Sequence, residues 1–186
     1  SILMHPDNKD LPLPVILTGP KSAAPYLHQL HAFVGATLGE AAQTRYEIII
    51  DDPVQVARQM TVGLKAVKQF RRDRNDAFHF NWMLRIEEGF QRPFDPTHAN
   101  MASLQLSLDL PPHELAANLR RAFSGIVAGN VKDKGIRLIE QHGPYQIRGD
   151  AAVMQPLDRL LKSFVEQHRM KLPGGAAYVP CYQVVT

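Results

Sequence analysis

Two uninterrupted apolar runs, at 15–17 and 48–50, stand out in the first part of the chain. Turn-forming residues follow each run at once, Thr-Gly-Pro at 18–20 and Asp-Asp-Pro at 51–53. An unbroken apolar run is typical of a strand that is buried on both faces of a parallel sheet. Apolar positions three and four residues apart between the runs predict a helix from an N-cap at Ser22 to about Leu38. The pattern predicts a βαβ unit with a right-handed crossover.

A second helix is predicted after the second run. Asp52 is its expected N-cap and Pro53 its first residue, where the missing N–H costs nothing. Its expected buried stripe consists of Val56, Ala57, Met60, Leu64 and Val67. This helix would complete a Rossmann-like lobe. Because a charged run follows at 70–76, we predict that residues 1–70 are the C-terminal part of a Rossmann-like parallel sheet, and that 71–186 form a second domain.

The second domain is predicted to be a mainly helical α+β domain. Helices are expected over the aromatic-rich 77–90, after the two prolines at 111–112, before Gly143-Pro144, and up to about 168, the last one started or kinked by Pro156. Gly129-Asn130 is expected to break the second of these helices. Alternating residues at 104–109 predict a half-buried strand, another short strand is expected at 145–148, and the tail should be extended.

Composition narrows the function classes. The chain has 186 residues, of which 45% are apolar and 21% charged, as is typical of a globular protein with one good core or two small ones. Its net charge of +3 comes without a long block of like charges, which disfavours a nucleic-acid partner. No apolar stretch approaches the ~18 residues that span a bilayer, which disfavours a membrane partner. The single cysteine, Cys181, excludes an internal disulfide and suits a cytoplasmic protein.

The beginning of the chain suggests a piece of a longer polypeptide. It opens on Ser1, and residues 2–4 look like the last turn of a helix that His5-Pro6-Asp7-Asn8 would terminate. A sheet of two parallel strands is also too small to stand alone. We therefore expect this sequence to be the C-terminal part of a longer protein.

The first candidate site follows from the predicted sheet. Ligands of open parallel sheets bind beyond the carboxyl ends of the strands, which draws attention to 18–22 and 51–53. Thr18, Gly19, Pro20 and Lys21 offer a hydroxyl, a close-approach glycine and a cation before a helix. Contact with the phosphate or ribose of a substrate and ordinary turn chemistry both remain open for them.

The second candidate is the arginine run Arg71, Arg72 and Arg74. Guanidinium groups suit bidentate phosphate recognition, so the run is a candidate anion site, although such runs are usually a solvated face. Other motifs favour structural roles: Pro173-Gly174-Gly175 is interpreted as a turn, Cys181 as buried, and Gly125 and Gly129 as positions of close packing. The eight histidines, His28 and His31 included, lack metal-ligand spacing, so we expect no metal and no cofactor.

Particular segments resemble a known family. The succession from Leu13 to Pro20, then a helix, then Tyr46 to Pro53, resembles the closing βαβα part of the LOG family of Rossmann-like nucleotide phosphoribohydrolases. Segments 121–132, 169–174 and 178–182 (RAFSGIVAGNVK, RMKLPG and YVPCY) are similar to the C-terminal domain of the bacterial purine and pyrimidine nucleotide 5′-monophosphate nucleosidases. The resemblance covers essentially the whole chain.

The resemblance implies a reaction, partners and an assembly. The parent enzyme would hydrolyse the N-glycosidic bond of nucleoside monophosphates to free base and ribose 5-phosphate, and would form a homotetramer stimulated by (p)ppGpp. The family's catalytic signature, Pro-Gly-Gly-x-Gly-Thr-x-x-Glu, does not occur in this sequence. We therefore expect the isolated chain to be inactive, and assign it no catalytic residue. The alternative is a non-catalytic regulatory or oligomerisation module that binds a nucleotide effector such as (p)ppGpp.

Overall fold

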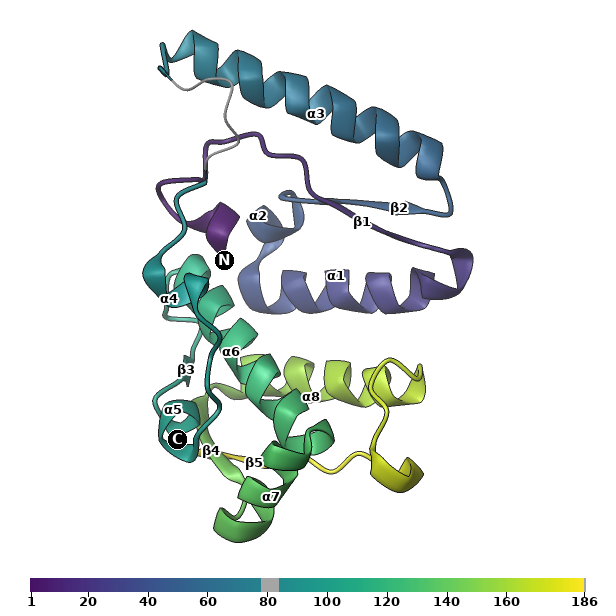
Figure 1. The fold of residues 1–186 in the computed structure, drawn as a ribbon, viewed down its shortest axis with the longest axis vertical. Coiled ribbons are helices and arrows are strands. Elements are labelled where there is room, and N and C mark those ends of the chain that lie inside the picture. The colour runs from purple at the N-terminus through teal and green to yellow at the C-terminus, as the bar shows by residue number, and fades with distance from the viewer. Residues whose placement is uncertain (78–83, 186) are drawn as a thin grey trace. The chain divides into compact units, whose positions relative to one another are not determined.

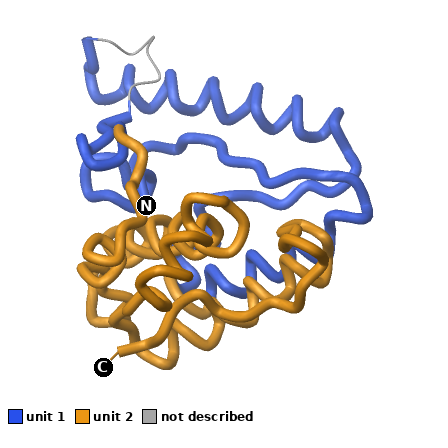
Figure 2. The backbone as a smooth tube through the Cα atoms, turned by 60° about the horizontal axis from the view of Figure 1, so that its bottom comes forward, with its two compact units in different colours: residues 1–35, 39–91 blue, residues 36–38, 92–186 orange. Residues whose placement is uncertain are grey.

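The computed structural model describes residues 1–77 and 84–185, which fall into two compact units. Unit 1 comprises Ser1–Gly35 and Gly39–Gln91, and unit 2 comprises Ala36–Leu38 and Arg92–Thr186 (Figure 2). The units divide later in the chain than the domain boundary expected at 70/71. That boundary concerns the family's domains rather than these packing units, and it stays a prediction.

Unit 1 contains the predicted βαβα succession (Figure 1). Its elements are η1 (Ile2–Met4), β1 (Ile16–Gly19), η2 (Lys21–Ala23), α1 (Ala24–Leu38, of which 36–38 fall in unit 2), α2 (Glu40–Gln43), β2 (Glu47–Ile50), α3 (Pro53–Asp73) and α4 (Glu88–Gln91). β1 and β2 pair in parallel, from Ile16 beside Glu47 to Gly19 beside Ile50. In both views α1 and α3 lie on opposite sides of this ladder. The predicted parallel pairing is confirmed, whereas a complete Rossmann-like sheet is not seen in these two strands.

The helix boundaries in unit 1 follow local chemistry with one exception. The Asp52 carboxylate accepts the Gln55 N–H at 2.8 Å and Pro53 is the first residue of α3, as predicted. α1 ends at Gly39, whose φ of 81° is in the region that favours glycine. Ser22 is not the N-cap of α1, because the chain first forms the short helix η2, in which the Ala23 N–H donates to the Pro20 carbonyl at 2.8 Å.

Burial in unit 1 is less complete than the apolar runs predict. Ile49 is the only residue of β1 and β2 that is buried. On α3, Val67 is fully buried, Val56, Met60 and Leu64 are half-buried, and Ala57 is exposed. Strands with unbroken apolar runs thus keep part of their side-chain surface accessible in this unit.

Unit 2 is built on three parallel strands in the order β3-β4-β5. Its elements are α5 (His98–Ala102), β3 (Gln105–Leu106), α6 (Pro112–Val131), α7 (Asp133–His142), β4 (Tyr145–Gly149), α8 (Ala151–Glu166), η3 (Pro173–Gly175) and β5 (Tyr182–Val185). The predicted helical content is confirmed, but the α+β class is corrected to α/β because every strand pairing is parallel. The extended tail supplies the third strand, and the strand expected at 104–109 is shorter than predicted.

Two further predictions about unit 2 are corrected. α6 continues through Gly129 and Asn130 to Val131 instead of breaking there. A Gly in a helix costs about 1 kcal/mol relative to Ala. The close contact explains why Gly is nevertheless present, because a Cβ on Gly129 would lie 2.8 Å from the Cys181 sulfur. The Asn130 amide donates to the Ile126 carbonyl at 2.8 Å and to Cys181 Sγ at 3.1 Å. Pro156 lies inside α8, which rules out that it starts the helix and leaves the expected kink a prediction.

The helix predicted over 77–90 can be compared with the structure only in part. Residues 78–83 lie outside the described residues. Of the remainder, 84–87 is not helical, and α4 begins at Glu88. Among the described helices none is both long and apolar enough to cross a membrane.

Candidate functional site

The carboxyl ends of β1 and β2 bring the two predicted turns together. Gly19 ends β1 beside Ile50, and the Asp51 N–H donates to the Gly19 carbonyl at 2.9 Å. Asp51 has a φ of 57°, an uncommon conformation for a residue other than glycine. A Cβ on Gly19 would lie 2.9 Å from the Ala23 Cβ, so the turn approaches the following helix closely. The strand register therefore sets residues 18–21 beside Asp51.

This edge presents an exposed cation and an exposed carboxylate. Lys21 Nζ lies 3.8 Å from Asp51 Oδ2, and the two side chains are 87% and 49% exposed. Thr18 and Pro20 are also exposed, whereas Gly19 is half-buried. An ammonium suits a phosphate, and a carboxylate accepts hydrogen bonds from ribose hydroxyls. The structure thus sets the four consecutive predicted residues beside Asp51, and their contact with a substrate stays a prediction.

The arginine run is not a single surface. The Arg71 side chain is 8% exposed, and its Nη1 lies 3.4 Å from Asp76 Oδ2. The Arg74 side chain is 60% exposed, with Nη2 4.0 Å from Asp10 Oδ2 and its guanidinium 4.6 Å from the centre of the Phe70 ring. Arg72 is exposed. The geometry gives Arg71 a structural position at the end of α3 and leaves Arg72 and Arg74 accessible; the effector assignment stays a prediction.

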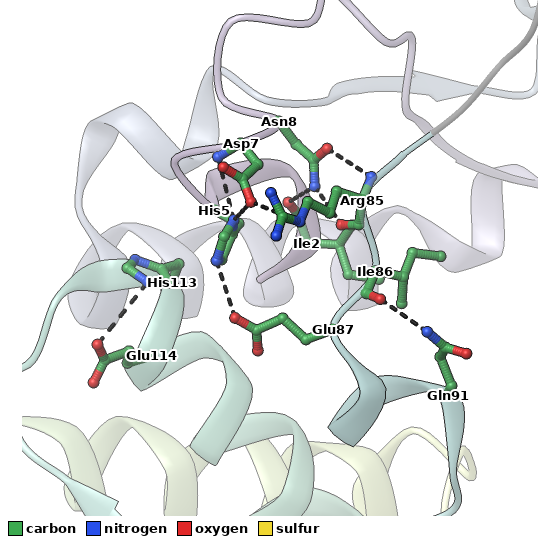
Figure 3. Close-up of polar contacts among 10 residues, drawn as sticks. All are labelled: Ile2, His5, Asp7, Asn8, Arg85, Ile86, Glu87, Gln91, His113 and Glu114. Atoms are coloured by element: carbon green, nitrogen blue, oxygen red, sulfur yellow. Dashed lines mark hydrogen bonds and ion pairs between the residues drawn. The ribbon is translucent and has the colours of Figure 1, made fainter.

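A polar cluster that the sequence analysis did not foresee ties two distant segments of unit 1 together (Figure 3). Asn8 is 3% exposed; its amide donates to the Arg85 carbonyl at 2.8 Å, and its Oδ1 accepts the Arg85 N–H at 3.0 Å. His5 Nε2 lies 2.9 Å from Glu87 Oε1, and Arg85 Nε lies 3.2 Å from Asp7 Oδ2. The His5-Pro6-Asp7-Asn8 turn is visible in the sequence, but its partners, Arg85 and Glu87, cannot be predicted from it because they lie far along the chain.

The remaining candidates have structural positions. Cys181 is buried, and burial raises the pKa of its thiol to about 12, so it is not a nucleophile in this conformation. His28 is exposed, and His31 Nδ1 lies 3.0 Å from the Tyr46 hydroxyl. Pro173-Gly174-Gly175 is an exposed turn with positive φ at both glycines. Within 1–77 and 84–185, no three His, Cys, Asp or Glu residues are grouped as metal ligands.

Comparison with known proteins fixes the family. Residues 64–185 match the family model described as "Pyrimidine/purine nucleotide monophosphate nucleosidase, C-terminal". The chain belongs to this family. It is 58% identical over 185 residues to the "Pyrimidine/purine nucleotide 5'-monophosphate nucleosidase" of Escherichia coli (strain K12), and equally to the same protein of Escherichia coli O157:H7. The match covers 100% of this chain and 40% of each relative. The resemblance to the C-terminal domain of these nucleosidases is thereby confirmed, and that to the wider LOG family stays a prediction.

Proposed function

We propose that this chain is the C-terminal part of an enzyme that hydrolyses purine and pyrimidine nucleoside monophosphates to free base and ribose 5-phosphate. The observation that carries the proposal is the 58% identity over 185 residues to relatives named as nucleotide 5'-monophosphate nucleosidases. Because the chain spans 40% of those relatives, the catalytic carboxylate that activates water would come from the remainder of the longer protein. The chain alone should then be inactive, and the assembly a homo-oligomer, with a homotetramer as its expected form.

In this proposal the substrate is contacted by Thr18, Gly19, Pro20 and Lys21. Lys21 would hold the 5′-phosphate, and Gly19 would allow the ribose phosphate to approach the backbone. Support comes from their position at the carboxyl edge of a parallel sheet, where ligands of such folds bind, and from the exposure of Lys21.

Release of base from AMP tests this proposal. A full-length nucleosidase that contains this region should release adenine, and the 186-residue chain should not. In the full-length enzyme, Lys21→Ala should lower kcat/KM by about 10- to 100-fold, the range for a lost charge-assisted hydrogen bond. Lys9→Ala, which removes an exposed lysine elsewhere in unit 1, is the control and should leave kcat/KM unchanged. Base release by the 186-residue chain, or equal effects of the two variants, would contradict the proposal.

A second candidate function is regulation through Arg71, Arg72 and Arg74. A polyanionic effector such as (p)ppGpp would bind the accessible guanidinium groups of Arg72 and Arg74 at the end of α3, and Arg71 would support that end through Asp76. The specific observation in favour is that two exposed arginines lie two residues apart at the end of a helix.

Calorimetry separates this function from a solvated helix end. Arg72→Ala in the full-length enzyme should weaken (p)ppGpp binding by about 10- to 100-fold while unstimulated turnover stays normal. Lys65→Ala, an exposed change earlier on the same helix, is the control. Unchanged (p)ppGpp affinity in both Arg72→Ala and Arg74→Ala would rule out the run as the effector site.

A further inference from the structure

The sheet of unit 2 has a hollow of about 520 Å³ at its carboxyl edge. Each of the three strands contributes a lining residue: Gln105, Arg148 and Val185. These three lie side by side, since Arg148 pairs in register with Gln105 on one side and with Val185 on the other. Ser107, Asp150 and Ala151 complete the rim where β3 and β4 end and α8 begins. Every lining residue belongs to unit 2. The hollow thus lies where ligands of parallel α/β sheets bind, and its size suits a small molecule.

Arg148 faces this hollow from the open face of the sheet. Along β4, Tyr145 and Ile147 are fully buried while Gln146 and Arg148 are exposed, so the strand covers one face and presents polar side chains on the other. Parallel sheets usually have both faces covered, which makes the open row unusual. Among the described residues, no carboxylate forms an ion pair with Arg148, so its guanidinium is available to a ligand.

The carboxylate of Asp150, two residues further on, already has donors. Its Oδ2 accepts the Ser107 hydroxyl at 2.7 Å and the Leu108 N–H at 2.9 Å. Asp150 therefore holds the β3 turn against the start of α8, and it does not cap its own helix, which has no side-chain cap. The partial positive charge of the first turn of α8 then adds to that of Arg148.

We propose that the hollow at the carboxyl edge of β3, β4 and β5 binds a small phosphorylated molecule, with its phosphate on Arg148. The Gln105 amide supplies a further donor, and Val185 and Ala151 provide apolar surface for the rest of the ligand. Arg148 acts here as a binding residue with no role in bond breaking. The site does not depend on the nucleosidase proposal, because its residues all lie in unit 2.

Nuclear magnetic resonance of the 186-residue chain tests the site directly. Sodium phosphate and ribose 5-phosphate are titrated at constant ionic strength, with sodium chloride as the reference salt. Saturable shifts of backbone amides are expected at 105–108 and 148–153 for both phosphates and not for chloride. The absence of saturable shifts at millimolar phosphate, or equal shifts with chloride, would overturn the proposal.

Three variants separate a built site from general surface charge. Arg148→Gln should weaken phosphate binding by at least about tenfold, as expected for a lost charge-assisted hydrogen bond. Arg137→Gln removes an exposed arginine of α7 and should bind phosphate as the unaltered chain does. Ala151→Asp places a carboxylate at the exposed first residue of α8, where it favours the helix and repels an anion, so binding should be lost in a folded protein. Equal weakening by Arg148→Gln and Arg137→Gln, or full binding by Ala151→Asp, would contradict the site.

Discussion

β4, the central strand of unit 2, and β2, the second strand of unit 1, both pair with parallel neighbours, but their side chains are buried to different extents. In β4 the side chains of Tyr145 and Ile147 are fully buried, and the residues between and after them, Gln146 and Arg148, are exposed. In β2 three isoleucines follow one another, and only Ile49 is buried. The alternating strand matches a sheet with one open face, whereas the unbroken run needs cover on both faces.

The same difference extends to the two cores. In unit 1 the only described residue of the apolar core with no exposed surface is Val67. In unit 2 the corresponding residues come from α5, α6, α8 and two strands: Met101, Leu106, Ala122, Ile126, Tyr145, Ile147, Val153, Leu157 and Leu161. Among the described residues, the fully buried apolar side chains thus lie almost entirely in unit 2. The apolar side chains of unit 1 are expected to gain further cover in the longer proteins to which this chain is related.

Matched isoleucine truncations give the largest expected contrast. Ile147→Ala should lower the free energy of unfolding of unit 2 by about 2–5 kcal/mol, because a fully buried side chain leaves a cavity. Ile48→Ala in the half-buried β2 should cost unit 1 less than half as much. Hydrogen exchange of the amides of each unit in the 186-residue chain reports the two values separately. Equal losses would show that β2 is as well covered as β4.

Close packing on α6 provides the next contrast. A Cβ on Gly125 would overlap the Met101 sulfur, and it would lie 3.2 Å from Pro96 Cβ. Gly125→Ala should therefore destabilise unit 2 by about 1–3 kcal/mol despite the better helix propensity of alanine. Ser124→Ala, at the exposed neighbouring position, is the control and should be nearly neutral. A stabilised Gly125→Ala variant would show that Met101 moves aside without cost.

Local signals in the sequence were sufficient for much of the fold. Asp52-Pro53 begins α3, and Gly39 and Gly143 end α1 and α7 at positive φ, because caps depend on adjacent residues. The parallel β1-β2 pair follows from two apolar runs joined by a helix. These features need no knowledge of what packs against them.

Features that depend on distant partners were not predicted. α6 passes through Gly129 because Cys181 and Tyr145 pack against it, and these lie far along the chain. β5 pairs in parallel with β4 although its sequence predicts only an extended tail. At the candidate sites, the sequence placed Lys21 beside a strand end, but the burial of Arg71 depends on the fold.

The N-cap of α3 in unit 1 is expected to contribute less stability than the buried side chains above. Asp52 caps α3 through the Gln55 N–H, so Asp52→Ala should destabilise unit 1 by about 0.5–2 kcal/mol. Asp52→Asn keeps the acceptor oxygen and is the matched control, with a smaller loss. The loss should appear first as faster hydrogen exchange in the first turns of α3. Protection of these amides that is unchanged in Asp52→Ala would mean that the cap contributes no stability.

The smallest expected change in stability concerns Asp150 in unit 2. Its carboxylate accepts hydrogen bonds from the turn after β3 and does not cap α8. The hydrogen bond from Ser107 and that from the Leu108 N–H lower the pKa of Asp150 below its usual value of 3.8. Its stabilising contribution should therefore be fully present above the pKa of the unfolded chain and should be lost as the pH falls through the lower folded value. Carbon-13 resonances of the carboxyl group, followed from neutral pH into the acid range, measure that pKa. Ser107→Ala removes the larger cause and should raise the pKa, whereas Ser124→Ala should not. An Asp150 pKa that is the same in Ser107→Ala and the unaltered chain would show that the Ser107 hydroxyl does not stabilise this carboxylate.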